Sequence, residues 1–191
     1  MVRKAFLAIG SFLLLISVAG CNSMPASESI HKRVHTAYYD MPAYSARCLV
    51  TAFSKGGQND YECTVHYNKD NNSYKVISDD MEIDIKGETT TISKGGNVLQ
   101  MPSSDDDMSI FLNTFFKSYY ESENTSLSVS DTSGQDATLL ECEVINPTPL
   151  QAHMKLWVDN KTALPLRMQV FGKDKFLNTE VSFKEFTPQK N

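Results

Sequence analysis

The sequence predicts an α+β fold in which a curved antiparallel β-sheet forms an open half-barrel and helices cover its concave face. From residue 43 onward, short segments of alternating polarity are separated by brief turns, and such connections join only antiparallel neighbours. The segments number about eleven, and an antiparallel sheet of that size must curl. A single segment with helical periodicity interrupts them, and its apolar face needs a surface to cover.

The N-terminus has the pattern of a cleaved targeting segment over residues 1–20. Arg3 and Lys4 precede an apolar run that is too short for a spanning helix, which needs roughly 20 residues. The run ends in V-A-G-C, which resembles the lipobox of bacterial lipoproteins and implies acylation of Cys21 after cleavage before it. An uncleaved anchor, or a signal cut nearby with Cys21 as a bystander thiol, is the alternative. The prediction is a lipid-anchored, extracytoplasmic protein.

Charge disfavours a nucleic-acid partner. Removing residues 1–20 leaves 16 basic and 23 acidic residues, a formal charge of −7, whereas nucleic-acid binding needs a basic surface. Residues 21–29 are small and polar and are expected to be a tether to a single domain over 30–191. Apolar residues at helical spacing (Ile30, Val34, Ala37 and Met41) then predict an amphipathic helix at 28–40.

Alternation and turn residues place the strands. The expected strands are 43–53, 60–68, 73–78, 81–86, 88–94 and 97–101 in the first half, then 126–130, 137–146, 152–160, 164–172 and 179–186. Asn160 and Lys161 are expected to form a hairpin turn. Pro165 comes near the start of a strand, where a missing N–H is tolerated.

The strongest periodic signal lies between the two sets of strands. Six apolar residues recur at steps of three and one and make one continuous face, which predicts a helix at 106–121: Met108, Phe111, Leu112, Phe115, Phe116 and Tyr119. Ser103, Ser104 and Asp105 to Asp107 are suited to its positive N-terminal end.

The aromatic content has two interpretations, which the sequence leaves open. Phe111, Leu112, Phe115, Phe116 and Tyr119 are the candidate apolar cavity or interaction face. Other aromatic residues can line the same cavity for a lipid or acyl chain, or they can form a packed core: Tyr44, Tyr61, Tyr67 and Trp157.

Three cysteines remain in the mature chain, an odd number, so at least one is unpaired or pairs between chains. Cys48 and Cys63 fall on consecutive expected strands and can meet across a hairpin as a disulfide. Two buried free thiols are the alternative, and Cys142 has no assigned role.

No catalytic, metal or cofactor motif stands out. His31 and His35 have a spacing that can hold zinc, but they lack the glutamate of a zinc protease, and Lys32 and Arg33 would repel a cation. The paired glycines sit in turns between strands and open no helix, so they form no phosphate-binding loop. The chain is therefore expected to be non-enzymatic.

Several stretches, in their order, resemble LolA/LolB-like lipoprotein carriers over residues 42–188. They are "NNSYKVISDDMEIDIKGETTTIS", and "KLWVDNKTALPLRMQVFGKD" followed by "TEVSFKEF". "SIFLNTFFKSYYESENTSLSV" is most similar to the clostridial germination branch of that group, the GerS lipoproteins. The three cysteines are a departure from the carriers.

The resemblance implies a non-catalytic lipoprotein of the forespore or spore envelope. It would bind and activate a cortex N-acetylmuramoyl-L-alanine amidase, so that muramic-δ-lactam forms in cortex peptidoglycan. A lipid or lipoprotein carrier is the alternative function. Because open sheets have exposed edges that pair with other chains, a homodimer is a further expectation.

Overall fold

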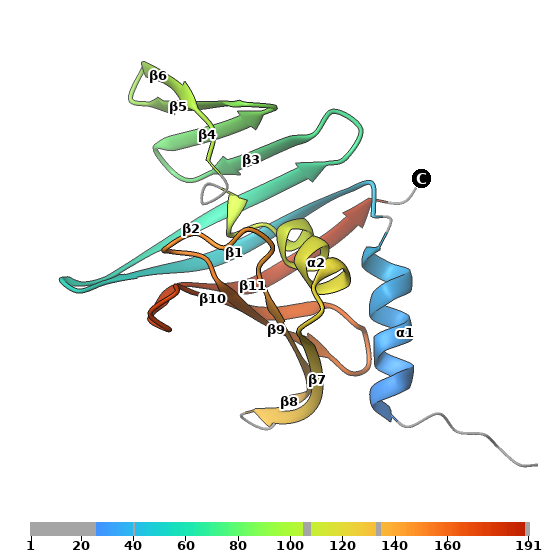
Figure 1. Cartoon of the computed structure of the whole chain (residues 1–191). Coiled ribbons are helices and arrows are strands. Elements are labelled where there is room, and N and C mark those ends of the chain that lie inside the picture. Colours follow the sequence, from blue (N-terminus) through green and yellow to red (C-terminus); the bar gives the residue numbers. More distant parts are fainter. Residues whose placement is uncertain (1–25, 40, 105–107, 133–134, 190–191) are drawn as a thin grey trace, which may run out of the picture.

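The computed structural model describes residues 26–39, 41–104, 108–132 and 135–189, which form eleven strands and two helices (Figure 1). The expected signal segment 1–20 and Cys21 lie outside these residues. The elements are α1 (Ala26–Tyr38), β1 (Ala43–Ser54), β2 (Gly57–Asn68), β3 (Ser73–Ile77), β4 (Met81–Lys86), β5 (Thr89–Lys94), β6 (Asn97–Pro102), α2 (Leu112–Glu121), β7 (Thr125–Thr132), β8 (Gln135–Glu143), β9 (His153–Asp159), β10 (Pro165–Phe171) and β11 (Leu177–Gln189).

All eleven strands belong to one antiparallel sheet, in the order β6-β5-β4-β3-β2-β1-β11-β10-β9-β8-β7. Two meanders, β1 to β6 and β7 to β11, are joined because the first strand pairs with the last, with a register shift between Arg47 and Cys48. The sheet is curved and leaves β6 and β7 at its two ends (Figure 1). The predicted half-barrel with helices on its concave face is confirmed.

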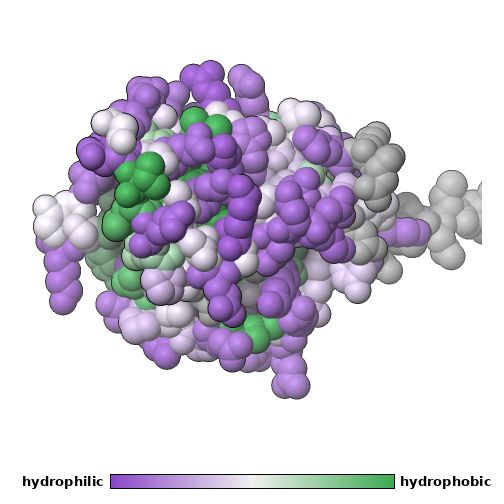
Figure 2. Space-filling model, turned by 90° about the horizontal axis from the view of Figure 1, so that it is seen from above, coloured by the Kyte–Doolittle hydropathy of each residue, from purple (hydrophilic) through white to green (hydrophobic). Residues whose placement is uncertain are grey.

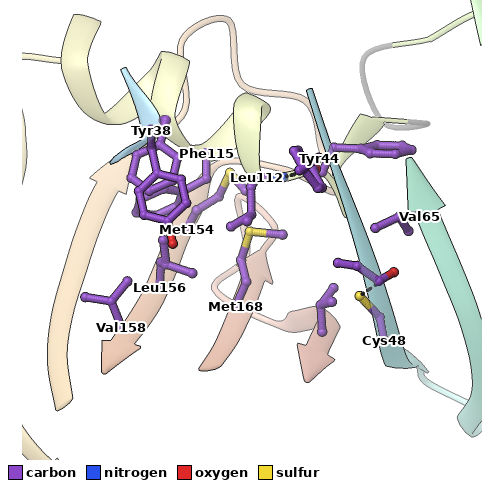
Figure 3. Close-up of a cluster of buried hydrophobic side chains, with 14 of the residues drawn as sticks. Tyr38, Tyr44, Cys48, Val65, Leu112, Phe115, Met154, Leu156, Val158 and Met168 are labelled. Atoms are coloured by element: carbon purple, nitrogen blue, oxygen red, sulfur yellow. Dashed lines mark hydrogen bonds between the residues drawn. The ribbon is translucent and has the colours of Figure 1, made fainter. Parts of the chain in front are cut away.

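The core lies between α2 and the concave face of the sheet. Alternate residues of the central strands point toward α2, and Val65, Leu156 and Met168 are completely buried there (Figure 3). Burying each such side chain contributes about 1.5–3 kcal/mol relative to exposure. The continuous apolar contact explains why the chain keeps α2 on this face.

The second helix begins later than the periodicity predicts. Phe111 is its extended N-cap residue and makes no side-chain capping bond, while Asp105 to Asp107 lie outside the described residues. The Leu112 N–H instead donates to the Tyr44 hydroxyl of β1 at 2.9 Å, and Thr114 Oγ1 donates to the Met108 carbonyl at 3.0 Å. A tertiary contact thus satisfies one of the N–H groups that have no partner within the first turn of a helix.

No helix in the described ranges is long and apolar enough to span a membrane.

Helix α1 is held to the β9–β10 hairpin by three hydrogen bonds. The Arg33 guanidinium donates to the carbonyl oxygens of Asn160 and Lys161, the latter at 2.9 Å. The Tyr38 hydroxyl donates to the Ala163 carbonyl at 2.7 Å. The hairpin turn expected at Asn160 and Lys161 is present, and α1 spans Ala26–Tyr38 against an expected 28–40.

Candidate functional site

The five residues of the candidate apolar face belong to α2 or to its N-cap, and their side chains are all buried against the sheet. Phe111, Leu112 and Phe115 have no exposed surface, and Phe116 and Tyr119 are 3% and 6% exposed. Their rings pack on one another and on the sheet: Tyr74 lies edge-on to Phe111 at 4.9 Å between centroids. The structure therefore fills the space between helix and sheet with the protein's own side chains (Figure 3).

The other aromatic residues that were considered for a cavity do not share one environment. Tyr44 belongs to the core, and Tyr67 is half-buried beside it. Tyr61 is 37% exposed because the outer half of β2 extends beyond the core. Trp157 alternates with the core residues of β9 and so faces the other side of the sheet, where the Arg167 guanidinium lies 4.0 Å from its ring.

Cys48, Cys63 and Cys142 are all buried, and the structure shows no bond between them. Cys48 and Cys63 are direct partners in the register of β1 and β2, so the hairpin expected from the sequence does bring them opposite each other. Burial raises the pKa of Cys48 and Cys142 to about 12 and that of Cys63 to about 11. These thiols stay protonated at neutral pH and are poor nucleophiles. A disulfide between Cys48 and Cys63 stays a prediction.

Histidines do not gather into a metal centre within the described residues. The His35 ring stacks on Tyr39 at 4.5 Å, and His31 contacts the Tyr119 ring at 6.0 Å. His153 lies between Glu141 and Glu143 across β8 and β9, at 3.6 and 3.5 Å. Each of these histidines thus contacts a neighbouring ring or carboxylate.

A cleft opens where both helices meet the ends of β2 and β3. It consists of two cavities of about 500 and 260 Å³, which share Asn72, Tyr74, Asn113 and Lys117. The larger cavity is the tyrosine end, to which Tyr38, Tyr39, Tyr67 and Tyr120 contribute. The smaller is the amide end, to which Asn146 and Gln151 contribute. We call the whole the tyrosine–amide cleft.

Several polar atoms in the cleft lack good partners. Asn113 Nδ2 donates to the Tyr74 hydroxyl at 2.8 Å, but Asn113 Oδ1 and the Tyr120 hydroxyl are buried without a partner among the described residues. Gln151 is 2% exposed, and its Nε2 donates to the Met154 sulfur, a weak acceptor, at 3.5 Å. Burial raises the pKa of Tyr120, so its hydroxyl stays protonated and able to donate.

The cleft was missed by sequence reasoning because its walls come from α1, β2, β3, α2 and the loop after β8. The signal that could have found it is weak. Asn72 and Asn146 are both in turns, with φ of 45° and 57°, a backbone conformation that asparagine tolerates better than most residues.

The edge strand β6 is exposed along its whole length. Val98, Leu99 and Met101 are 66%, 58% and 43% exposed, and the strand carries no charged residue. Figure 2 looks down on this end of the sheet and shows apolar side chains at the surface. Such an edge offers unpaired backbone groups to another strand.

Comparison with known proteins identifies the family. The model of the YdcC-like sporulation proteins matches residues 3–191. No curated protein matches the sequence.

Solved structures share the fold at low sequence identity. The lipoprotein LppX of Mycobacterium tuberculosis is 8% identical over 88% of this chain and 99% of its own, with a TM-score of 0.50. A LolA-superfamily protein from Nitrosomonas europaea is 12% identical, with coverages of 88% and 96% and a TM-score of 0.48. A chain in the structure of the CwlD amidase from Clostridioides difficile in complex with the GerS lipoprotein is 22% identical over 87% of this chain and 98% of its own, with a TM-score of 0.45. The likeness concerns the fold, whereas the family match extends over nearly the whole sequence, and this chain belongs to the YdcC-like family of sporulation proteins.

Proposed function

We propose that this chain is a membrane-anchored, non-catalytic lipoprotein that binds and activates a cortex N-acetylmuramoyl-L-alanine amidase during sporulation. The observation that carries the proposal is the filled concave face, on which Phe111, Leu112 and Phe115 are wholly buried. A lipid carrier needs an apolar space there, whereas a protein-binding module needs a rigid core and an exposed surface. The sporulation family and the residue stretches similar to germination lipoproteins support the partner class.

We assign the β6 edge to the amidase. Acylated Cys21 would hold the chain to the membrane five residues before Ala26, where α1 begins. The sheet carries β6 away from the N-terminal end of α1 (Figure 1), so the edge would face the peptidoglycan on which an amidase acts. Natural sheets commonly protect exposed edges with charges, and β6 has none. Pairing with a partner strand would cover Val98 and Leu99 and use the free backbone groups.

The experiment is co-purification of the full chain with its cognate amidase, followed by an assay on peptidoglycan. We expect Leu99→Lys, on exposed β6, to fold normally and to lose amidase binding and activation. Leu150→Lys is the matched control, because Leu150 is similarly exposed, at 55% against 58%, but lies in the loop between β8 and β9 and not on β6. An amidase that is fully active on its own would refute the function. Loss of a dimer in light scattering, with amidase binding intact, would assign the edge to a second copy of this chain.

The carrier function remains the second candidate because the tyrosine end of the cleft, at about 500 Å³, adjoins α2. Mass spectrometry of non-covalently bound lipid in the purified protein tests it. An acyl chain recovered in equal amount with the protein would favour the carrier.

A further inference from the structure

The tyrosine–amide cleft has the chemistry of a site for a polar, ring-containing ligand. Four carboxamides line it, from Asn72, Asn113, Asn146 and Gln151. A carboxamide both donates and accepts hydrogen bonds, as hydroxyl and acetamido groups require. At the other end, tyrosine rings offer flat apolar faces with polar tips. The larger cavity falls within the range of about 300–1,000 Å³ in which proteins bind small ligands.

The described residues of the cleft carry more positive than negative charge, whereas the whole chain is negatively charged. The whole sequence has a formal charge of −5, yet no acidic residue of the described part of the chain lines the amide end, and Lys117 lies between the two ends. Lys117 is exposed and makes no ion pair or hydrogen bond with the described part of the chain. Lys69 and Glu121 lie at the tyrosine end and offset each other. An ammonium at the middle of the cleft that has no carboxylate partner among the described residues favours a ligand that carries a carboxylate there.

Two residues that line the cleft also carry a buried polar atom without a partner. Asn113 Oδ1 and the Tyr120 hydroxyl are unpaired among the described residues, which is costly, and a ligand would satisfy either atom once its side chain turns toward the cleft. Asn72 and Asn146, which line the amide end, hold positive φ angles of 45° and 57°, a conformation that asparagine tolerates. These two sets of residues come from different segments of the chain and meet only in this cleft.

We propose that the tyrosine–amide cleft binds a muropeptide, an N-acetylated disaccharide whose lactyl group continues into a short peptide with a free carboxylate. The sugar rings pack on Tyr39 and Tyr67, a carboxylate pairs with Lys117, and the amides of the peptide bond to Asn113 and Gln151. The peptidoglycan source of the ligand rests on the proposed function, whereas the ligand chemistry rests on the cleft. The chain would then bring wall substrate and amidase together.

The test is calorimetric titration of the purified full chain, without amidase, with the soluble probe N-acetylglucosaminyl-N-acetylmuramyl tripeptide. We expect saturable binding, weakened about tenfold by Lys117→Ala, since a hydrogen bond to a charged group is lost. Tyr120→Phe is expected to weaken binding while the chain melts at the same or a higher temperature, because a buried unpaired hydroxyl is removed. Lys184→Ala is the matched control: Lys184 is exposed on β11 and lies outside the cleft, so its affinity should equal the unmodified chain's.

Three outcomes would overturn the proposal: no heat with the probe at millimolar concentration, equal affinity for neutral di-N-acetylchitobiose, or displacement of the probe by palmitate. Equal affinity of Lys117→Ala and Lys184→Ala would also overturn it. Because the assay contains no amidase, the two proposals fail separately. A chain that activates the amidase but ignores the muropeptide refutes only the ligand, and a chain that binds the muropeptide but not the amidase refutes only the proposed function.

Discussion

Replacing Phe115 by alanine tests whether the concave face is a filled core or the wall of a cavity. Phe115 has no exposed surface, and its ring lies 5.3 Å from Phe116 and 5.7 Å from Tyr119 between centroids. Truncating a buried phenylalanine removes its transfer free energy and leaves a void, at a cost of about 3–5 kcal/mol. Domains of this size are stable by about 5–15 kcal/mol in total. The loss is therefore a large share of the free energy of unfolding.

Urea denaturation followed by circular dichroism measures this loss, with Phe176→Ala as the control. Phe176 carries the same side chain but is 40% exposed in the turn before β11, and its backbone bonds to Gly172 and Asp174 do not depend on the ring. We expect the control to change the free energy of unfolding by less than about 1 kcal/mol. If Phe115→Ala costs no more than Phe176→Ala and takes up lipid on purification, the ring lines a cavity and the filled-core reasoning is wrong.

Three further predictions follow from single contacts. Burial raises the pKa of the three buried thiols to about 11–12, so none should react with Ellman's reagent in the folded chain at pH 8. After denaturation three should react if Cys21 is acylated and four if it is not, and a Cys48–Cys63 disulfide would lower either count by two. The Thr162 backbone N–H holds the pKa of Asp159 below its ordinary value, so this stabilisation is complete above about pH 4 and is lost as pH falls through the lowered pKa. Acid titration of Asp159→Asn should show a smaller loss of stability below pH 4, and an unchanged acid profile would contradict it. Arg33→Ala removes two hydrogen bonds to the β9–β10 turn and should cost about 1 kcal/mol, with faster proteolysis within α1; unchanged proteolysis would show that α1 does not depend on them.

Local pattern was enough to predict the strands. In β2 the buried Cys63 and Val65 alternate with half-buried polar residues, and in β10 Met168 and Val170 do the same, because side chains on a strand point alternately to its two faces. Residues typical of turns then predict loops at the positions where the structure has them. The half-barrel follows from strand number, since a twisted open sheet of more than about ten strands rarely forms without curling.

Contacts between residues far apart in the chain could not be predicted from local sequence pattern. Nothing in β1 or β11 alone predicts that Val50 pairs with Val181, the contact that unites the two meanders. The start of α2 was wrong for the same reason, because the group that receives the Leu112 N–H is Tyr44, 68 residues earlier. The tyrosine–amide cleft depends on such contacts throughout, and only the fold brings Asn72, Asn113 and Asn146 together.

The position of α1 links the predicted anchor to the cleft. This helix supplies Tyr38 and Tyr39 to the tyrosine end, and the Tyr38 ring also stacks on Phe116 of α2 at 4.6 Å. The same Tyr38 donates its hydroxyl to Ala163, and Arg33 holds the adjoining turn. Because only residues 22–25 separate Cys21 from α1, an acylated Cys21 would place the N-terminal end of α1 close to the bilayer. Tyr38 and Tyr39 lie at the other end of this helix, about 20 Å farther along its axis. Detaching α1 would open the cleft and expose Phe116 together, so anchor, cleft and core depend on one helix.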